Sequence, residues 1–166
     1  MLYVRWAGLV FMAAVVLFYF FRPETYSLLD YANLIFHEAG HVLFGFSGEL
    51  LMYLGGSLNQ VLVPLLCSGY FAYRRDLYAS GLTLMWAAES MINVSVYIRD
   101  AQERTLPLIT DDPDTHDWWN ILVILNRLQQ DDAIARVVVF WAFLLYLVAL
   151  YLGFKGLFAQ AQENSG

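Results

Sequence analysis

Residues 34–44 read Leu-Ile-Phe-His-Glu-Ala-Gly-His-Val-Leu-Phe, an apolar segment that carries two histidines and one glutamate. On a helix, His37 and His41 project from the same face, so both imidazoles can bind one metal ion. Glu38 lies one position further round, where its carboxylate can deprotonate a water molecule as a general base. Because imidazole and carboxylate groups are costly in an apolar helix, this segment predicts a buried functional site.

The composition of the 166-residue chain is typical of a membrane protein. Hydrophobic residues make up 60% and charged residues 14%, against about 45–50% and about 25% in soluble domains. The formal net charge is −6 and the basic residues are scattered, so we expect no nucleic-acid partner. Cys67 is the sole cysteine, which excludes an internal disulfide and a cysteine-rich zinc site. We predict one integral-membrane domain over residues 1–158 and a disordered polar tail over 159–166.

Long uncharged runs predict an all-α fold, a multi-pass bundle of about five transmembrane helices in the lipid bilayer. The runs cover residues 6–21, 28–48, 50–73, 77–98 and 137–154. A further apolar segment over residues 116–128 is too short to span the bilayer. It is expected to lie at the membrane interface or to fold back into the protein.

Polar residues form one stripe on each of two predicted spans. Their spacing of three or four residues places the members of each stripe on one helix face. The second span carries Asp30, Asn33, His37 and His41, and the fourth span carries Glu89, Asn93, Tyr97 and Asp100. Since polar groups avoid lipid, we expect the two stripes to face each other inside the bundle.

A third metal ligand is expected from the end of the fourth span or the loop that follows it. A catalytic zinc ion usually has three protein ligands and one open position, and the motif histidines supply two. Asp100 and His116 are nearly equal candidates, and Asp117 is a more distant one. The candidate that does not bind zinc can hold an imidazole by its other nitrogen. Without a metal, His116 would be an exposed loop residue and Asp100 would pair with a nearby arginine.

The charged loops indicate how the predicted spans are oriented. With five spans, the amino terminus and the acidic loop 99–116 lie on one side, and Arg22, Arg74-Arg75 and Lys155 lie on the other. Basic residues in short loops favour the cytoplasm, so we expect the acidic loop to lie outside. The histidine motif lies in the half of its span that is nearer this loop.

His37-Glu38-Ala39-Gly40-His41 inside a membrane span resembles the site-2 protease class of intramembrane zinc peptidases. The wider pattern is similar to a group of small bacterial membrane proteins related to that class, and it comprises Gly55-Gly56-Ser57-Leu58, Asp100-Ala101 and His116-Asp117-Trp118. The resemblance implies that both motif histidines and a later aspartate bind zinc while Glu38 activates water. It favours Asp100 as that aspartate, and it implies a location in the bacterial inner membrane.

The sequence therefore predicts a membrane-embedded zinc metallopeptidase that acts on a membrane protein or peptide. Glu38 would take a proton from water and return it to the leaving amine. Asn59 or Asn93 would bind the substrate or stabilise the oxyanion. Two alternatives are a zinc-dependent hydrolase of a lipid or small amide, and a non-enzymatic scaffold whose polar stripes hold its helices together. A zinc transporter would need a continuous polar path, whereas the polar groups here gather in one half of the predicted bundle.

Overall fold

The computed structural model describes residues 2–26 and 28–163, and its regular elements there are all helices. The longer ones are α1 (Leu2–Phe21), α2 (Leu28–Phe44), α3 (Glu49–Tyr73), α4 (Leu77–Arg99), α5 (Asp117–Ile124) and α6 (Asp131–Glu163), with 3₁₀ turns η1 (Pro113–Thr115) and η2 (Leu128–Gln130). The predicted all-α class is confirmed. α6 continues into the segment that the sequence assigns to a polar tail, and residues 164–166 lie outside the described residues.

Three of the described helices are long and apolar enough to cross a membrane, which indicates a membrane protein. These segments are Tyr3–Phe21, Glu49–Tyr73 and Leu128–Ala159. The prediction of five such spans is therefore wrong in number. α2 has 17 residues, and its length of about 26 Å falls short of a hydrocarbon core about 30 Å thick.

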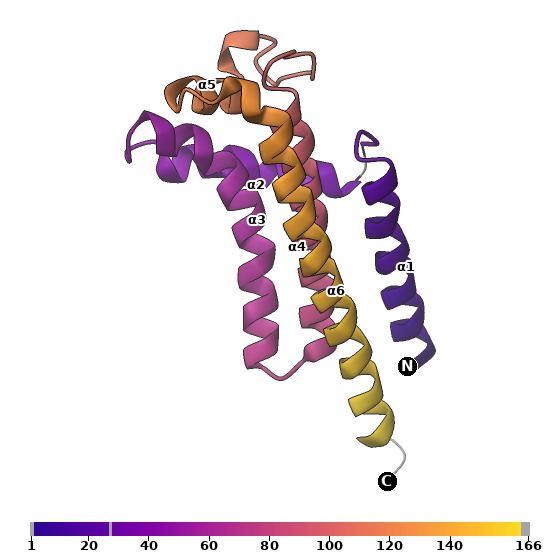
Figure 1. Ribbon diagram of the computed structural model, residues 1–166. Helices are drawn as coiled ribbons and strands as arrows, with labels where there is room; N and C mark the ends of the chain where they lie inside the picture. The colour runs from indigo at the N-terminus through magenta and orange to yellow at the C-terminus, as the bar shows by residue number, and fades with distance from the viewer. Residues whose placement is uncertain (1, 27, 164–166) are drawn as a thin grey trace.

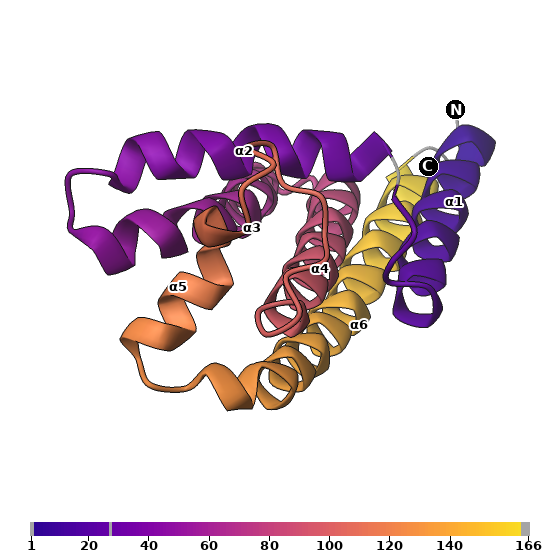
Figure 2. The same ribbon diagram turned by 90° about the horizontal axis from the view of Figure 1, so that it is seen from above.

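α2 also lies across the other long helices and not beside them. In Figure 1, α1, α3, α4 and α6 run in roughly the same direction, whereas α2 crosses them near one end. The view from above shows α2 lengthwise while the others recede from the viewer (Figure 2). The prediction of a span over residues 28–48 fails because hydropathy reports how apolar a helix is and says nothing about its direction.

The segments found at each end of the bundle differ from the prediction, because α2 does not run from one end of the bundle to the other. The start of α1 and the end of α6 lie at the same end as the α3–α4 turn (Figure 1). There the Tyr78 hydroxyl donates to the Arg5 carbonyl oxygen at 2.9 Å, and the Arg5 guanidinium lies over the Tyr78 ring. The prediction that the amino terminus shares a side with the loop 99–116 is therefore wrong, since that loop lies at the opposite end with α5.

α4 is the central helix of the bundle and packs along both α3 and α6 (Figure 1). A Cβ on Gly81 would lie 2.5 Å from the Gly153 nitrogen, and a Cβ on Gly156 would lie 2.3 Å from the Tyr78 nitrogen. Glycine at these positions lets α4 and α6 approach closely, as small residues do between membrane helices. α4 is long enough to cross a membrane, with 23 residues, but its buried polar residues lower its hydropathy.

The polar stripes of α2 and α4 face each other, which confirms the prediction from their spacing. Asn33 Nδ2 donates to Glu89 Oε2 at 2.9 Å, and Asn93 Nδ2 donates to Asp30 Oδ1 at 2.7 Å. Trp86 Nε1 donates to Asn33 Oδ1 at 2.9 Å. These buried hydrogen bonds hold α2 against the bundle and fix which of its faces points inward.

α2 and α3 form a tight antiparallel hairpin around glycine. Gly48 precedes α3 with a φ of 100°, a left-handed conformation that favours glycine. Where the helices are closest, a Cβ on Gly40 would lie 2.1 Å from the Gly55 carbonyl oxygen, so no larger residue fits there. The short distance between the helices brings the side chains of α3 to the histidines of α2.

Candidate metal centre

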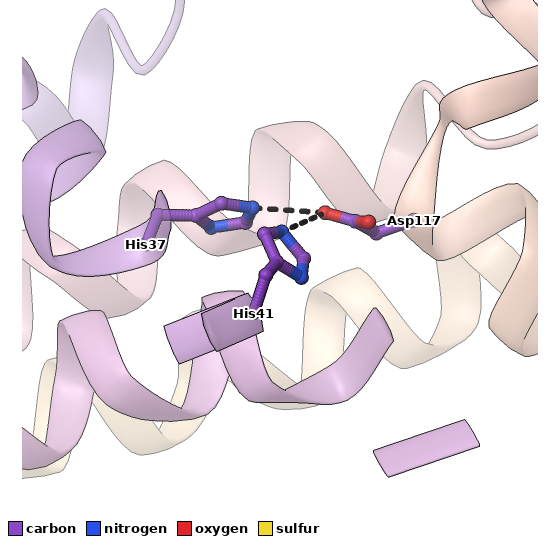
Figure 3. Close-up of side chains that lie close together, drawn as sticks. All are labelled: His37, His41 and Asp117. Atoms are coloured by element: carbon purple, nitrogen blue, oxygen red, sulfur yellow. Dashed lines mark hydrogen bonds and ion pairs between the residues drawn. The ribbon is translucent and has the colours of Figure 1, made fainter. Parts of the chain in front are cut away.

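Two histidines from α2 and one aspartate from α5 converge on a single point. Asp117 Oδ2 lies 2.8 Å from His37 Nε2 and 3.2 Å from His41 Nε2. Figure 3 shows both rings turned toward this carboxylate. The three donor atoms all lie within 4.8 Å of one another, a spacing at which they could hold one metal ion. No other group of three or more such side chains occurs in the part of the chain that the structure describes.

Asp117 reaches the histidines because α5 folds back against α3. His116 caps α5, and its Nδ1 accepts a hydrogen bond from a backbone amide of the first turn at 3.1 Å. Trp118 Nε1 donates to Ser57 Oγ at 2.9 Å, and the Tyr97 hydroxyl accepts from the Asp117 amide at 3.0 Å. One face of the segment 116–128 is folded back into the protein, with His116, Ile121 and Leu122 buried, whereas Val123, Ile124 and Leu125 are exposed.

The second nitrogen of each motif histidine contacts a fixed group of α3. His41 Nδ1 lies 2.8 Å from the Met52 carbonyl oxygen. Since a carbonyl can only accept, His41 Nδ1 donates and its Nε2 is directed at Asp117. His37 Nδ1 lies 2.8 Å from Gln60 Oε1. Both imidazoles therefore present the same nitrogen, Nε2, to the centre of the group.

Gly56 leaves the space in which the His37 ring lies. A Cβ at this position would be 2.5 Å from His37 Nε2 and 2.7 Å from the two carbons beside it. Any residue larger than glycine at position 56 would overlap His37 Nε2, the nitrogen that faces Asp117. The segment that the sequence analysis singled out at Gly55-Gly56 thus has two distinct effects, because Gly55 sets the approach of the helices and Gly56 clears the ring.

Asp100 and His116, the two residues that the sequence ranks first as third ligand, lie outside this group. Asp100 accepts hydrogen bonds from the Thr105 amide and hydroxyl and from the Leu106 amide, at 2.8–3.0 Å. His116 is fully buried, and because its Nδ1 accepts, its Nε2 donates to Asp100 Oδ2 at 3.3 Å. Asp100 therefore anchors the loop after α4, and His116 fixes the start of α5. Both residues position Asp117 and do not join its group.

A cavity of about 490 Å³ opens onto the three converging side chains. Its lining includes His37, Glu38, His41 and Asp117 together with the loop segment 106–110. Glu38 is exposed in this cavity and makes no hydrogen bond or ion pair with the residues that the structure describes. Its carboxylate is therefore available to a molecule that enters.

The two predicted substrate-binding asparagines occupy different surroundings. Asn59 Nδ2 donates to the Phe36 carbonyl oxygen at 2.7 Å, and Asn59 does not line the cavity. Asn93 lines the cavity, but its amide already contacts Asp30 and Gln60. Asn59 thus ties α3 to α2, and Asn93 belongs to a polar chain behind His37.

Hydrogen bonding and burial set the protonation of the site. The hydrogen bond to Asp117, opposed by burial, raises the pKa of His41 to about 9. Burial favours the neutral form of Asp117, but hydrogen bonds from His37 and His41 outweigh it and lower the Asp117 pKa. Burial also lowers the pKa of His116, although Asp100 opposes the shift. Without a metal ion, these shifts favour an ionised Asp117 carboxylate beside a protonated His41.

The sequence ranks Asp117 below Asp100 and His116, although the structure has Asp117 beside the motif histidines, and it does not single out Gln60 as a contact of His37. Helix periodicity carries no information about the path of a loop, so it cannot tell which acidic residue returns to the histidines. A local signal does exist, because Asp117 starts an apolar segment that is too short to span and must pack elsewhere. Gln60 lies one helical turn after Gly56, and this spacing places both on the α3 face toward His37.

No protein-family model matches this chain, and no curated protein and no solved structure matches it either. The function is therefore argued from the residues of the site.

Proposed function

We propose that this protein is a membrane-embedded zinc metallopeptidase in which His37, His41 and Asp117 bind zinc and Glu38 is the general base. One observation carries the proposal: three metal-binding side chains from two distant segments converge at a cavity that also exposes a glutamate. A scaffold would need neither the convergence nor the open glutamate.

The donor atoms fit zinc in kind, and they lie within 4.8 Å of one another, so a bound ion would have to draw the group closer together. Ligands of a tetrahedral zinc ion lie about 3.3 Å apart, given metal–ligand distances of about 2.0–2.2 Å. The present distances of 2.8 and 3.2 Å from Asp117 to the two histidines need to change by about half an ångström or less. Two histidines and one carboxylate leave a fourth position open, as in catalytic zinc sites. This set matches the one implied by the resemblance to site-2 proteases, with Asp117 in place of Asp100.

Glu38 performs the proton transfers of the proposed reaction. Zinc held by the three side chains supplies a Lewis acid that makes peptide hydrolysis feasible at neutral pH. Glu38 accepts a proton from the attacking water and delivers it to the nitrogen of the leaving amine. The backbone contacts at Met52 and the side chain of Gln60 keep the two imidazoles in place during both transfers.

The walls of the cavity favour an apolar substrate segment. Leu34 and Val96 line it from α2 and α4, and the loop segment 106–110 lines it with leucine and isoleucine side chains. Asp100 holds this loop through the amides of its first residues. Such a surface suits the apolar segment of a membrane protein or peptide, and it also suits the acyl chain of a lipid, the second candidate substrate.

The charge distribution supports a multi-pass arrangement with the site at the outer face of a bacterial inner membrane. α1, α3, α4 and α6 would cross the bilayer, and α2 and α5 would lie at one end. The opposite end carries four of the nine basic residues, Arg5, Arg74, Arg75 and Lys155, and the end with the site carries the other five. Arg74 and Arg75 form the short turn between α3 and α4, and basic residues in a short turn favour the cytoplasm. From this turn we infer that the acidic loop and the site lie outside.

The decisive test compares purified wild type with Glu38→Gln for zinc content and for cleavage of a quenched fluorescent transmembrane peptide. Both proteins are expected to hold one zinc ion, while the variant loses roughly 10²–10⁴-fold in rate, the usual contribution of a general base. A wild type without stoichiometric zinc, or equal cleavage by both proteins, would refute the proposal. Zinc without peptide cleavage, but with hydrolysis of a lipid ester or amide that needs Glu38, would select the lipid alternative.

A further inference from the structure

A chain of polar side chains runs from His37 into the protein on the side away from Asp117. His37 Nδ1 contacts Gln60 Oε1 at 2.8 Å, and Gln60 Nε2 donates to Asn93 Oδ1 at 3.0 Å. Asn93 Nδ2 in turn donates to Asp30 Oδ1 at 2.7 Å. Gln60 and Asp30 border the cavity but are themselves buried, so their polar groups depend mainly on hydrogen bonds within the protein. Two amides thus connect the carboxylate of Asp30 to the imidazole of His37.

The carboxylate at the far end gives this chain a direction. Asn93 Nδ2 donates to Asp30 Oδ1, so Asn93 turns its amino group toward Asp30. The oxygen of Asn93 then faces Gln60, which must present its own amino group. Consequently the oxygen of Gln60 faces His37, and only a protonated Nδ1 can satisfy it.

A second contact supports the same orientation of Gln60. Gln60 Nε2 also lies 3.4 Å from the carbonyl oxygen and from the hydroxyl of Ser90. A backbone carbonyl only accepts, so the amino group of Gln60 belongs on that side as well. The Ser90 hydroxyl donates to the backbone carbonyl oxygen of Gln60 at 3.0 Å, which holds α3 and α4 together.

We propose that Asp30, acting through Asn93 and Gln60, fixes the tautomer of His37 and so keeps His37 Nε2 ready to bind zinc. Asp30 and Gln60 are then positioning residues for the metal centre. This inference rests on the proposed function, because it assumes that His37 is a zinc ligand. It extends the site to a carboxylate on the first turn of α2, seven positions before His37 in the sequence.

The inference predicts how zinc affinity responds when the carboxylate is neutralised. In Asp30→Asn, the new amide can present either its nitrogen or its oxygen to Asn93, so both directions of the chain become possible. When the chain reverses, Gln60 turns its amino group to His37, and the proton moves to Nε2, where it blocks the metal. Zinc affinity should fall about 10- to 100-fold, the usual effect of losing a group that orients a ligand.

A double variant provides the sharper test. In Asp30→Asn/Gln60→Glu, the carboxylate at position 60 lies next to His37. It accepts a hydrogen bond from His37 Nδ1 in either orientation of the Asn93 amide. Asn93 then reverses and is still satisfied by the amide at position 30. Zinc affinity should return to within about threefold of wild type, since every hydrogen bond between His37 and position 30 is again paired and only the 3.4 Å contact with the Ser90 carbonyl oxygen is lost. Gln60→Glu alone should bind zinc more weakly than the double variant, because Asn93 would then lie between two carboxylates and could donate to only one.

The experiment measures zinc affinity of the full-length protein in detergent by competition with a chromophoric chelator, alongside thermal unfolding. The matched control is Glu89→Gln, which alters a buried carboxylate of the same helix pair that accepts a hydrogen bond from Asn33 and from no member of this chain. Its zinc affinity should equal that of wild type. Selective ¹⁵N labelling of the three histidine rings adds a direct readout, in which wild type shows a proton on His37 Nδ1 and Asp30→Asn shows it partly lost.

Unchanged affinity and an unchanged His37 ring spectrum in Asp30→Asn would overturn the inference. A double variant that binds no better than its two single parents would also overturn it, provided that it unfolds at the wild-type temperature. If the double variant unfolds early, the ring spectrum of Asp30→Asn decides. The proposed function fails separately, when wild type binds no zinc or when His37→Ala binds it as well as wild type does.

Discussion

Replacing Gly56 with alanine adds a single methyl group at the point where the structure has least room for it. The added carbon would lie 2.5 Å from His37 Nε2, whereas carbon atoms in contact normally stay about 3.5–4.0 Å from their neighbours. The ring must therefore move by about 1 Å to relieve the overlap. Metal–ligand distances tolerate only about 0.2 Å, so a displaced ring cannot remain a ligand.

The loss of zinc affinity in Gly56→Ala depends on whether the overlap with the His37 ring occurs in the zinc-free or the zinc-bound protein. Without zinc, the His37 ring can turn aside, and alanine favours the helix over glycine by up to about 1 kcal/mol. With zinc, the ring must return against the methyl group, at an overpacking cost of about 1–3 kcal/mol. This cost corresponds to a loss of zinc affinity of about 5- to 140-fold. The free energy of unfolding of the metal-free protein should change little.

The assay is a zinc competition titration of wild type, Gly56→Ala and a matched control on the same helix. The control is Gly69→Ala, because a Cβ there meets no atom within 4 Å. It should bind zinc as wild type does and gain slightly in thermal stability. Equal zinc affinity of both variants and wild type would refute the placement of His37 Nε2 beside Gly56, and with it the geometry of the site.

Three further predictions follow from the same contacts. Asp117→Ala should abolish stoichiometric zinc binding, whereas Asp100→Ala should bind zinc more weakly and should loosen the loop 99–116 to proteolysis; zinc analysis and limited proteolysis would show the reverse pattern if Asp100 were the ligand. Because the pKa of His41 is raised to about 9 in the metal-free protein, each zinc ion should displace about one proton below that pH. The logarithm of the zinc affinity should then rise by about one for each pH unit from 7 to 9, and a flat profile in the titration would contradict it. Gly81→Val should destabilise the bundle by at least about 1–3 kcal/mol through its contact with the α6 backbone, and an unchanged melting temperature would argue against this packing.

Helix periodicity predicts a large part of this structure from the sequence. The spacing of Asp30, Asn33 and His37 places them on one face of α2, and the structure pairs two of them with residues of the α4 stripe. The separation of four residues between His37 and His41 brings their rings to a centroid distance of 4.8 Å. These features depend on the geometry of one helix or on the general cost of polar groups in lipid.

The direction of α2 and the identity of the third donor are beyond such reasoning. Hydropathy predicts one more span over the segment 28–48 because it contains no information on helix packing. In the structure, the close contact of Gly40 with Gly55 holds α2 against α3. Likewise, the sequence favours Asp100 over Asp117 as the third ligand, and only the hydrogen bonds of the loop show which carboxylate lies beside the histidines. Asp100 is already occupied by the amides of Thr105 and Leu106, whereas Asp117 emerges at the start of a capped helix facing the histidines.

The pairing of His37 with Asp117 joins positions 80 residues apart. During synthesis, the histidine motif leaves the ribosome long before its partner carboxylate exists, so an unfinished chain has only two of the three donors. In the proposed function, zinc could therefore bind only after α3 and α4 have been synthesised and α5 has folded back against the histidines. In a cell, bound zinc would then distinguish completed molecules from truncated ones, and no nascent chain would be able to hydrolyse a substrate.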